Sequence, residues 1–159
     1  MGAEDLEEAF PNLRASGYSI TSPPAYVPNC IGWVLRSTDL YWDPTLTGFR
    51  GVYYWPPDIP RNDTVDAWVR VFRLFHYSEC ANPDLEDGAE KIAIYGGTDG
   101  TAQHVARQLP SGAWTSKLGQ DEDIEHQTLD ALASEEYGAV IRIMRRPLPQ
   151  ADNFDERSL

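Results

Sequence analysis

The chain has 159 residues and a mass of 17.9 kDa, a size that favours one compact domain with its own hydrophobic core. With 13 Lys and Arg against 25 Asp and Glu, its net charge is −12, which repels phosphate backbones and anionic lipid surfaces and argues against nucleic-acid or membrane partners. No apolar run is long enough to span a bilayer, the acidic N-terminus is unlike a signal peptide, and two cysteines are too few for a disulfide scaffold. We therefore expect a protein of the reducing cytoplasm.

The first half of the chain predicts short helices separated by proline-rich segments. Apolar residues recur with helical spacing in three segments: 4–14, 30–36 and 64–77. Pro11 closes the first, Asn29 is a good N-cap for the second, and Asn62 or Asp63 is in position to cap the third. Prolines and aromatic residues dominate the other segments. They predict an extended stretch over 21–28 and a loop over 39–62, with one short strand at 51–55 within that loop.

The second half predicts an antiparallel sheet. Alternating or β-rich segments separated by glycine-containing turns mark the expected strands: 91–95, 101–109, 113–118 and 139–144. Residues 122–134 suit a helix capped by Asp121 or Asp123. This order of elements predicts an α+β fold, a single domain over residues 1–149, and a polar, disordered tail over residues 150–159.

Cys30 is the first candidate for chemistry because it would begin the helix over 30–36. Backbone N–H groups and the helix dipole at that position lower the pKa of a thiol and stabilise the nucleophilic thiolate. The same N–H groups, that of Cys30 included, could hold an oxyanion. An inert, packed cysteine is the alternative interpretation, and it is the more common one on position alone. Cys80 has no such setting and is expected to be structural.

His104 is the candidate base. Its same-face neighbours on the expected strand are Ala102 and Ala106, which leave space above the imidazole ring for a helix that bears the nucleophile. A Cys–His pair gives a thiolate–imidazolium nucleophile, and the histidine later protonates the leaving group. The competing interpretation is a histidine with ordinary partners on a half-buried strand, or an exposed one.

Ser116 is the candidate for orienting the imidazole. If Leu109 pairs with Ala113 across the turn at 110–112, Ser116 lies diagonally opposite His104 on the same face. A slip of one residue would present Lys117 instead, and a cation is a poor partner for an imidazolium.

Asp123 and His126 are alternative orienters if the segment 121–126 folds back over the strand. Their ordinary roles would be a helix cap and a solvated histidine.

No metal or cofactor is expected. The histidines and cysteines lack zinc-ligand spacing, and the glycine-rich segment 96–100 lacks the lysine and the following helix of a phosphate-binding loop. Three further residues would form the oxyanion site and substrate cleft around the nucleophile: Asn29, Trp33 and Lys117.

Four motifs resemble those of a family of uncharacterised bacterial proteins: NCIGW at 29–33, HVARQL at 104–109, WTSKLG at 114–119 and DIEH at 123–126. This resemblance covers most of residues 10–147. The chain is more loosely similar to papain-like, NlpC/P60-type cysteine hydrolases, in which a cysteine at a helix N-terminus precedes an antiparallel sheet that carries a histidine and a polar orienter. Cys30, His104 and Ser116 follow that order. The sequence departs from this group in having Asn-Cys-Ile where Asp-Cys-Ser is usual, and serine as the third member.

The leading hypothesis is a small cysteine hydrolase that acts on a peptide or another amide, as a peptidase, amidase or deamidase. A second hypothesis is a non-catalytic binding or immunity-type module whose acidic surface faces a basic protein partner. A third is an acyl transferase, because an amine can resolve an acyl-enzyme in place of water.

Overall fold

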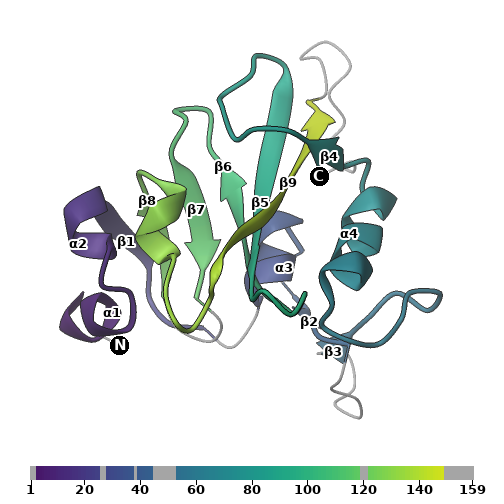
Figure 1. The fold of residues 1–159 in the computed structure, drawn as a ribbon, viewed down its shortest axis with the longest axis horizontal. Coiled ribbons are helices and arrows are strands. Elements are labelled where there is room, and N and C mark those ends of the chain that lie inside the picture. Colours follow the sequence, from purple (N-terminus) through teal and green to yellow (C-terminus); the bar gives the residue numbers. More distant parts are fainter. Residues whose placement is uncertain (1–2, 26–27, 38, 45–52, 119–121, 149–159) are drawn as a thin grey trace.

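The computed structural model describes residues 3–25, 28–37, 39–44, 53–118 and 122–148. These residues form a seven-stranded sheet in the order β1-β8-β7-β6-β5-β9-β4, and each pair of neighbouring strands is antiparallel (Figure 1). The strands are β1 Tyr18–Ser22, β4 Ser78–Cys80, β5 Ala89–Gly96, β6 Ala102–Gln108, β7 Trp114–Lys117, β8 Asp123–His126 and β9 Ala139–Pro147. The expected α+β class with an antiparallel sheet is confirmed.

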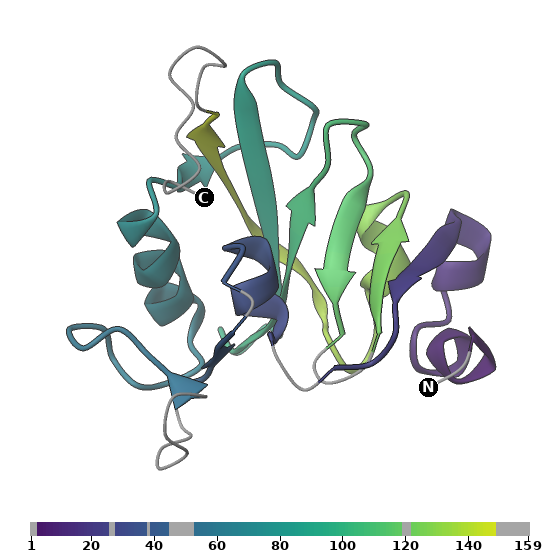
Figure 2. The same cartoon turned by 180° about the vertical axis from the view of Figure 1, so that it is seen from behind.

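The described helices are short and cover both faces of the sheet (Figures 1 and 2). They are α1 Ala3–Ala9, α2 Leu13–Ser16, α3 Cys30–Val34, α4 Val65–Leu74 and the 3-10 helix η1 Leu129–Leu132. The expected helix over 4–14 is therefore two helices, since Pro11 falls between α1 and α2. None of the described helices has the length and apolar character needed to cross a membrane.

Capping side chains fix where α3 and α4 begin. The Asn29 side chain accepts a hydrogen bond from the backbone N–H of Gly32, so the expected N-cap of α3 is confirmed. Thr64, not Asn62 or Asp63, caps α4 by accepting from the N–H of Ala67.

Each face of the sheet carries its own apolar cluster. The α3 face carries Ile92, Ile94 and Val105, which pack with residues of α3 and α4. The α1 face carries Tyr95 and Ala106, which pack with residues of α1, α2 and η1. Because side chains alternate along a strand, the adjacent residues Val105 and Ala106 of β6 point toward opposite clusters.

The expected helix over 122–134 is wrong. Residues 123–126 form β8, which pairs with both β7 and β1, and the Asp123 carboxylate accepts hydrogen bonds from the hydroxyls of Thr21 and Ser22 on β1. The supposed cap therefore holds two strands together. The alternative cap Asp121 lies outside the described residues.

Two short strands, β2 Tyr41–Trp42 and β3 Tyr53–Tyr54, form a separate parallel pair. The strand expected at 51–55 thus corresponds to β3, while residues 51–52 lie outside the described part of the chain, as does the tail over 150–159. The edge strands β1 and β4 were not expected from the sequence.

Gly138 permits the close approach of two chain segments before β9. Its φ is 74°, and a Cβ atom there would collide with the carbonyl oxygen of Gly96. We expect Gly138→Ala to lower the free energy of unfolding by about 2 kcal/mol. The control is Gly88→Ala, because Gly88 has a similar φ of 77° but open space around it, so only the backbone cost of about 1 kcal/mol applies. If urea denaturation shows that the two variants lose the same free energy of unfolding, this account is contradicted.

Candidate functional site

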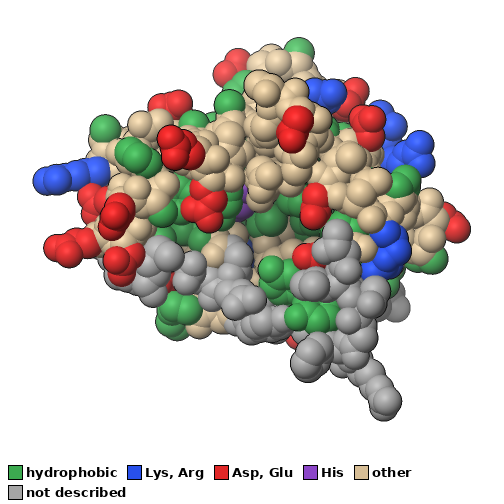
Figure 3. All heavy atoms as spheres, turned by 60° about the horizontal axis from the view of Figure 1, so that its bottom comes forward, with side chains coloured by type: hydrophobic (Ala, Val, Ile, Leu, Met, Phe, Trp, Pro, Cys, Tyr) green, Lys and Arg blue, Asp and Glu red, His purple; other side chains and the backbone are tan. Residues whose placement is uncertain are grey.

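The candidate site is a cavity of about 550 Å³ across one end of the sheet. Residues from both faces line it, among them Cys30, Asp43, Asp63, His104, Glu136 and Tyr137. Figure 3 looks into this end of the molecule and shows a hollow with hydrophobic and acidic side chains around it and a histidine inside. Among the described lining residues there is no Lys or Arg, so the cavity is electrostatically suited to cationic groups.

Cys30 begins α3 and is 8% exposed. Burial is the dominant influence on its thiol and raises the pKa to about 12, although the backbone N–H groups of Val105 and Ile31 act to lower it. The nearby charge of Asp63 raises it further. The expected lowering of this pKa at the start of the helix is therefore wrong, because desolvation outweighs the N–H groups. At neutral pH Cys30 is a thiol.

His104 begins a chain of hydrogen bonds on the α1 face. Its Nε2 lies 2.9 Å from the hydroxyl of Ser116, which lies 2.8 Å from Nε2 of His126. Nδ1 of His126 is 2.9 Å from the carbonyl oxygen of Thr128. The expected register, with Leu109 paired to Ala113, brings Ser116 to His104, and His126, the alternative orienter, joins the same chain.

The carbonyl of Thr128 fixes the direction of every bond in this chain. A carbonyl only accepts, so Nδ1 of His126 donates, and Nε2 of that neutral imidazole accepts from the Ser116 hydroxyl. The Ser116 oxygen then accepts from Nε2–H of His104. Nδ1 of His104 is left with a lone pair and has no hydrogen-bond partner among the described residues.

Both imidazoles are neutral at physiological pH. Burial lowers the pKa of His104 well below its usual value, and the charge of His126 acts in the same direction. Burial also lowers the pKa of His126 to about 4, against the opposing hydrogen bond to Thr128. The neutral state agrees with the tautomers that the hydrogen bonds require.

The space above the His104 ring is filled by Tyr137. The two rings are stacked, with centroids 4.3 Å apart and an interplanar angle of 4°. The expectation that the nucleophile-bearing helix packs there is wrong, because α3 lies on the opposite face. Tyr137 belongs to the turn before β9, and no local pattern in the sequence connects it to His104.

Cys30 and His104 approach the cavity from opposite faces of β6. Cys30 packs in the cluster of the α3 face with Val105, whereas His104 contacts Tyr95 and Tyr137 on the α1 face. The structure has no hydrogen bond between these two described residues. Both line the cavity, so the cavity is the place where the two groups can act on one molecule.

Asn29 lines the cavity as a structural anchor. Its Nδ2 donates to the carbonyl of Trp42 at 2.6 Å, and its Oδ1 accepts from the N–H groups of Trp42 and Gly32. These bonds tie α3 to β2, which brings Tyr41 to Asp43 into the cavity wall.

The other two expected cleft residues lie outside the cavity lining. Trp33 donates from Nε1 to the hydroxyl of Thr115 at 2.9 Å, and Lys117 donates to the carbonyl of Ala25 at 2.8 Å. Cys80 lies half-buried in β4. Among the described residues, no group of three His, Cys, Asp or Glu side chains is arranged to hold a metal ion.

The sequence model of a domain of unknown function, DUF7689, matches residues 19–145. The chain belongs to the DUF7689 family. The expected membership of an uncharacterised family is thus confirmed, and the DUF7689 match includes the site residues Cys30, His104, Ser116 and His126. No curated protein and no solved structure matches the chain.

Proposed function

We propose that this DUF7689 protein is a cysteine hydrolase that cleaves an amide bond in the cavity at the end of the sheet. Cys30 is the nucleophile and His104 the general base. One observation carries the proposal: the hydrogen-bond chain through Ser116 to Thr128 leaves an unshared lone pair on Nδ1 of His104, in a cavity that Cys30 also lines.

The neutral thiol and neutral imidazole favour general-base catalysis over a preformed ion pair. A water molecule in the cavity relays the thiol proton to Nδ1 of His104 while Sγ of Cys30 forms a bond to the substrate carbonyl carbon. The imidazolium returns this proton to the leaving amine as the C–N bond breaks. Water, with His104 again as base, then hydrolyses the thioester and restores the thiol.

The charge of the cavity favours a cationic substrate. Asp43, Asp63 and Glu136 line it together with aromatic side chains. Amides of lysine, arginine or a polyamine carry the complementary charge. The order of Cys30, His104 and Ser116 along the chain, similar to that of papain-like NlpC/P60-type hydrolases, supports the same chemistry.

The rate at which iodoacetamide alkylates Cys30 tests this proposal without a known substrate. Peptide mass spectrometry separates Cys30 from Cys80, which is the internal reference. We expect His104→Gln to slow alkylation of Cys30 at least about tenfold at pH 8, because the base that removes its proton is lost. Cys80 should react at the same rate in both proteins.

The matched control is His76→Asn, which removes an exposed histidine that is not among the described residues lining the cavity. Asparagine is chosen because residue 76 has a φ of 73°. The cysteine-hydrolase proposal fails if Cys30 reacts equally fast in the wild type and in His104→Gln.

A second candidate is a non-catalytic module that binds a basic partner in the same acidic cavity. The buried thiol with a pKa of about 12 favours it, since such a group is inert on its own. Under this alternative Cys30→Ala keeps full binding of a Lys- or Arg-rich peptide, and alkylation of Cys30 is independent of His104.

A further inference from the structure

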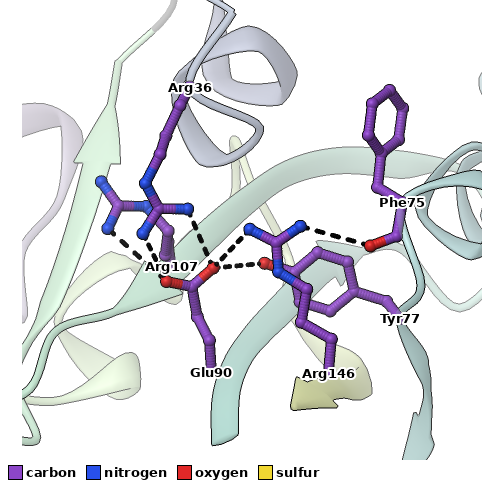
Figure 4. A network of polar contacts seen from close by, with 6 residues as sticks. All are labelled: Arg36, Phe75, Tyr77, Glu90, Arg107 and Arg146. Atoms are coloured by element: carbon purple, nitrogen blue, oxygen red, sulfur yellow. Dashed lines mark hydrogen bonds and ion pairs between the residues drawn. The ribbon is translucent and has the colours of Figure 1, made fainter. Parts of the chain in front are cut away.

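A cluster of positive charge lies at the other end of β6, away from the proposed catalytic cavity. Three arginines from different parts of the chain surround Glu90 (Figure 4). Arg36 donates through Nη1 and Nη2 to the two carboxylate oxygens, Arg146 donates at 3.1 Å, and the Tyr77 hydroxyl donates at 2.7 Å. Nη1 of Arg107 is 4.0 Å from the nearer oxygen.

The charges in this cluster do not balance. Three guanidinium groups face one carboxylate, and the four side chains are only 5–28% exposed. Charged groups withdrawn from water need compensating charge or hydrogen bonds. An excess of positive charge is the more notable because the whole chain carries −12.

Arg107 is the member without sufficient partners. It forms no hydrogen bond to any described residue, and its buried Nε atom has no acceptor among these residues. Arg146, by contrast, also donates to the carbonyl of Phe75 and lies over the ring of Tyr77. Burial, and then the charge of Arg36, lower the pKa of Arg107, which is the electrostatic sign of an undercompensated cation.

A cavity of about 250 Å³ adjoins this arginine. Arg36 and Arg107 line it together with the apolar side chains of Leu85, Leu109 and Leu148. Glu90 lines it as well, and so do two further carboxylates, Glu86 and Asp87.

Neither of these carboxylates compensates Arg107. Glu86 already pairs with Arg145 at 2.5 Å and lies 3.8 Å from Lys91, and Asp87 is exposed. With Glu86 neutralised in this way, the three arginines around Glu90 carry three positive charges, against two negative charges on Glu90 and Asp87.

We propose that this second cavity binds an oxyanion, a carboxylate or a phosphate group, through the guanidinium of Arg107 with support from the charge of Arg36. A guanidinium presents paired N–H donors that match two oxygens of such a group. The leucine side chains accommodate an organic body attached to it. Bound there, the anion supplies the acceptors and the charge that Arg107 lacks. This site does not depend on the proposed hydrolase activity.

Isothermal titration of the full chain at constant ionic strength, with chloride as the balancing anion, tests the oxyanion site. One arm uses inorganic phosphate and the other uses hexanoate, a carboxylate with an apolar chain. We expect one saturable site per chain for at least one of these anions. The anion that binds more tightly identifies the chemical group that the site prefers.

Arg107→Met should weaken this binding at least tenfold, whereas Arg70→Met, which removes an exposed arginine from α4, should leave it unchanged. Arg107→Lys, which keeps the charge and loses the paired donors, should fall between them. Because Arg107 makes no hydrogen bonds to described residues, we also expect Arg107→Met to melt at or above the wild-type temperature in buffer without phosphate or carboxylate. The oxyanion proposal is overturned if neither anion binds, or if Arg107→Met binds as the wild type does.

Discussion

Glu90→Gln is expected to lower the free energy of unfolding by about 4 kcal/mol, within the range measured when one partner of a buried ion pair is removed. Glu90 is 6% exposed and is the carboxylate on which Arg36, Arg107 and Arg146 converge. Glutamine keeps the size of the side chain and one acceptor oxygen, but it leaves three half-buried cations without a counter-charge. Urea denaturation at pH 7 measures the loss.

The matched control is Glu79→Gln. Glu79 pairs with Arg142 at 3.6 Å, and both side chains are about half exposed, so its removal should cost less than about 1 kcal/mol. Similar losses in the two variants would show that the Glu90 cluster is no stronger than a surface ion pair.

The titration of Glu90 gives a further check. Burial acts to raise the pKa of Glu90, but hydrogen bonds from Arg36 and Tyr77 and the charges of the arginines lower it overall. The stabilisation is therefore present above the ordinary carboxyl pKa and is lost as the pH falls through the lowered value. In Glu90→Gln the free energy of unfolding should therefore fall less than in the wild type as the pH is lowered through this range.

The sequence predicts the geometry around His104 where local rules govern the chain. A short turn at 110–112 sets the pairing of β6 with β7, and the two-residue period of a strand then places Ser116 on the face of His104. The N-cap at Asn29 is predicted for a similar reason, since capping depends on residues within one turn of helix.

Contacts between distant segments account for most of the errors. The helical pattern over 122–134 gives way to β8 because Ile124 is buried between β1 and β7, and β1 is about 100 positions away in the chain. Two other arrangements also depend on contacts between distant segments. One is the ring of Tyr137 over His104, and the other is the group of arginines around Glu90. Residue spacing along one element cannot reveal such contacts.

The side of the sheet on which Cys30 packs is a further property that the sequence leaves open. Helical and strand periods predict which face of each element is apolar, but not which face of the sheet a helix covers. The segment between β1 and α3 could lead to either face. In the structure α3 packs against Val105 rather than His104, and this placement replaces the expected ion pair with a neutral thiol and a neutral imidazole.

Because His104 and His126 are buried in their neutral forms, we expect the protein to lose much of its stability in mild acid. The pKa of His126 is about 4 in the fold because of burial, against about 6.5 in an unfolded chain. Between these values the unfolded chain binds a proton that the native protein does not. The contribution of His126 to the free energy of unfolding is therefore fully present above pH 6.5 and is lost as the pH falls toward 4. His126 alone accounts for roughly 3 kcal/mol over this window, and His104, whose pKa is also lowered, adds to it in the same direction.

Urea denaturation at pH 7, 6 and 5 measures this dependence. We expect the free energy of unfolding to fall by at least about 2 kcal/mol between pH 7 and pH 5. In His126→Gln the free energy of unfolding should depend less on pH, because His104 is then the one histidine left in the buried hydrogen-bond chain. His76→Asn should reproduce the wild-type slope, since His76 is exposed. If His126→Gln keeps the wild-type slope, the pKa of His126 is the same in the fold as in the unfolded chain, and burial does not keep this imidazole neutral in mild acid.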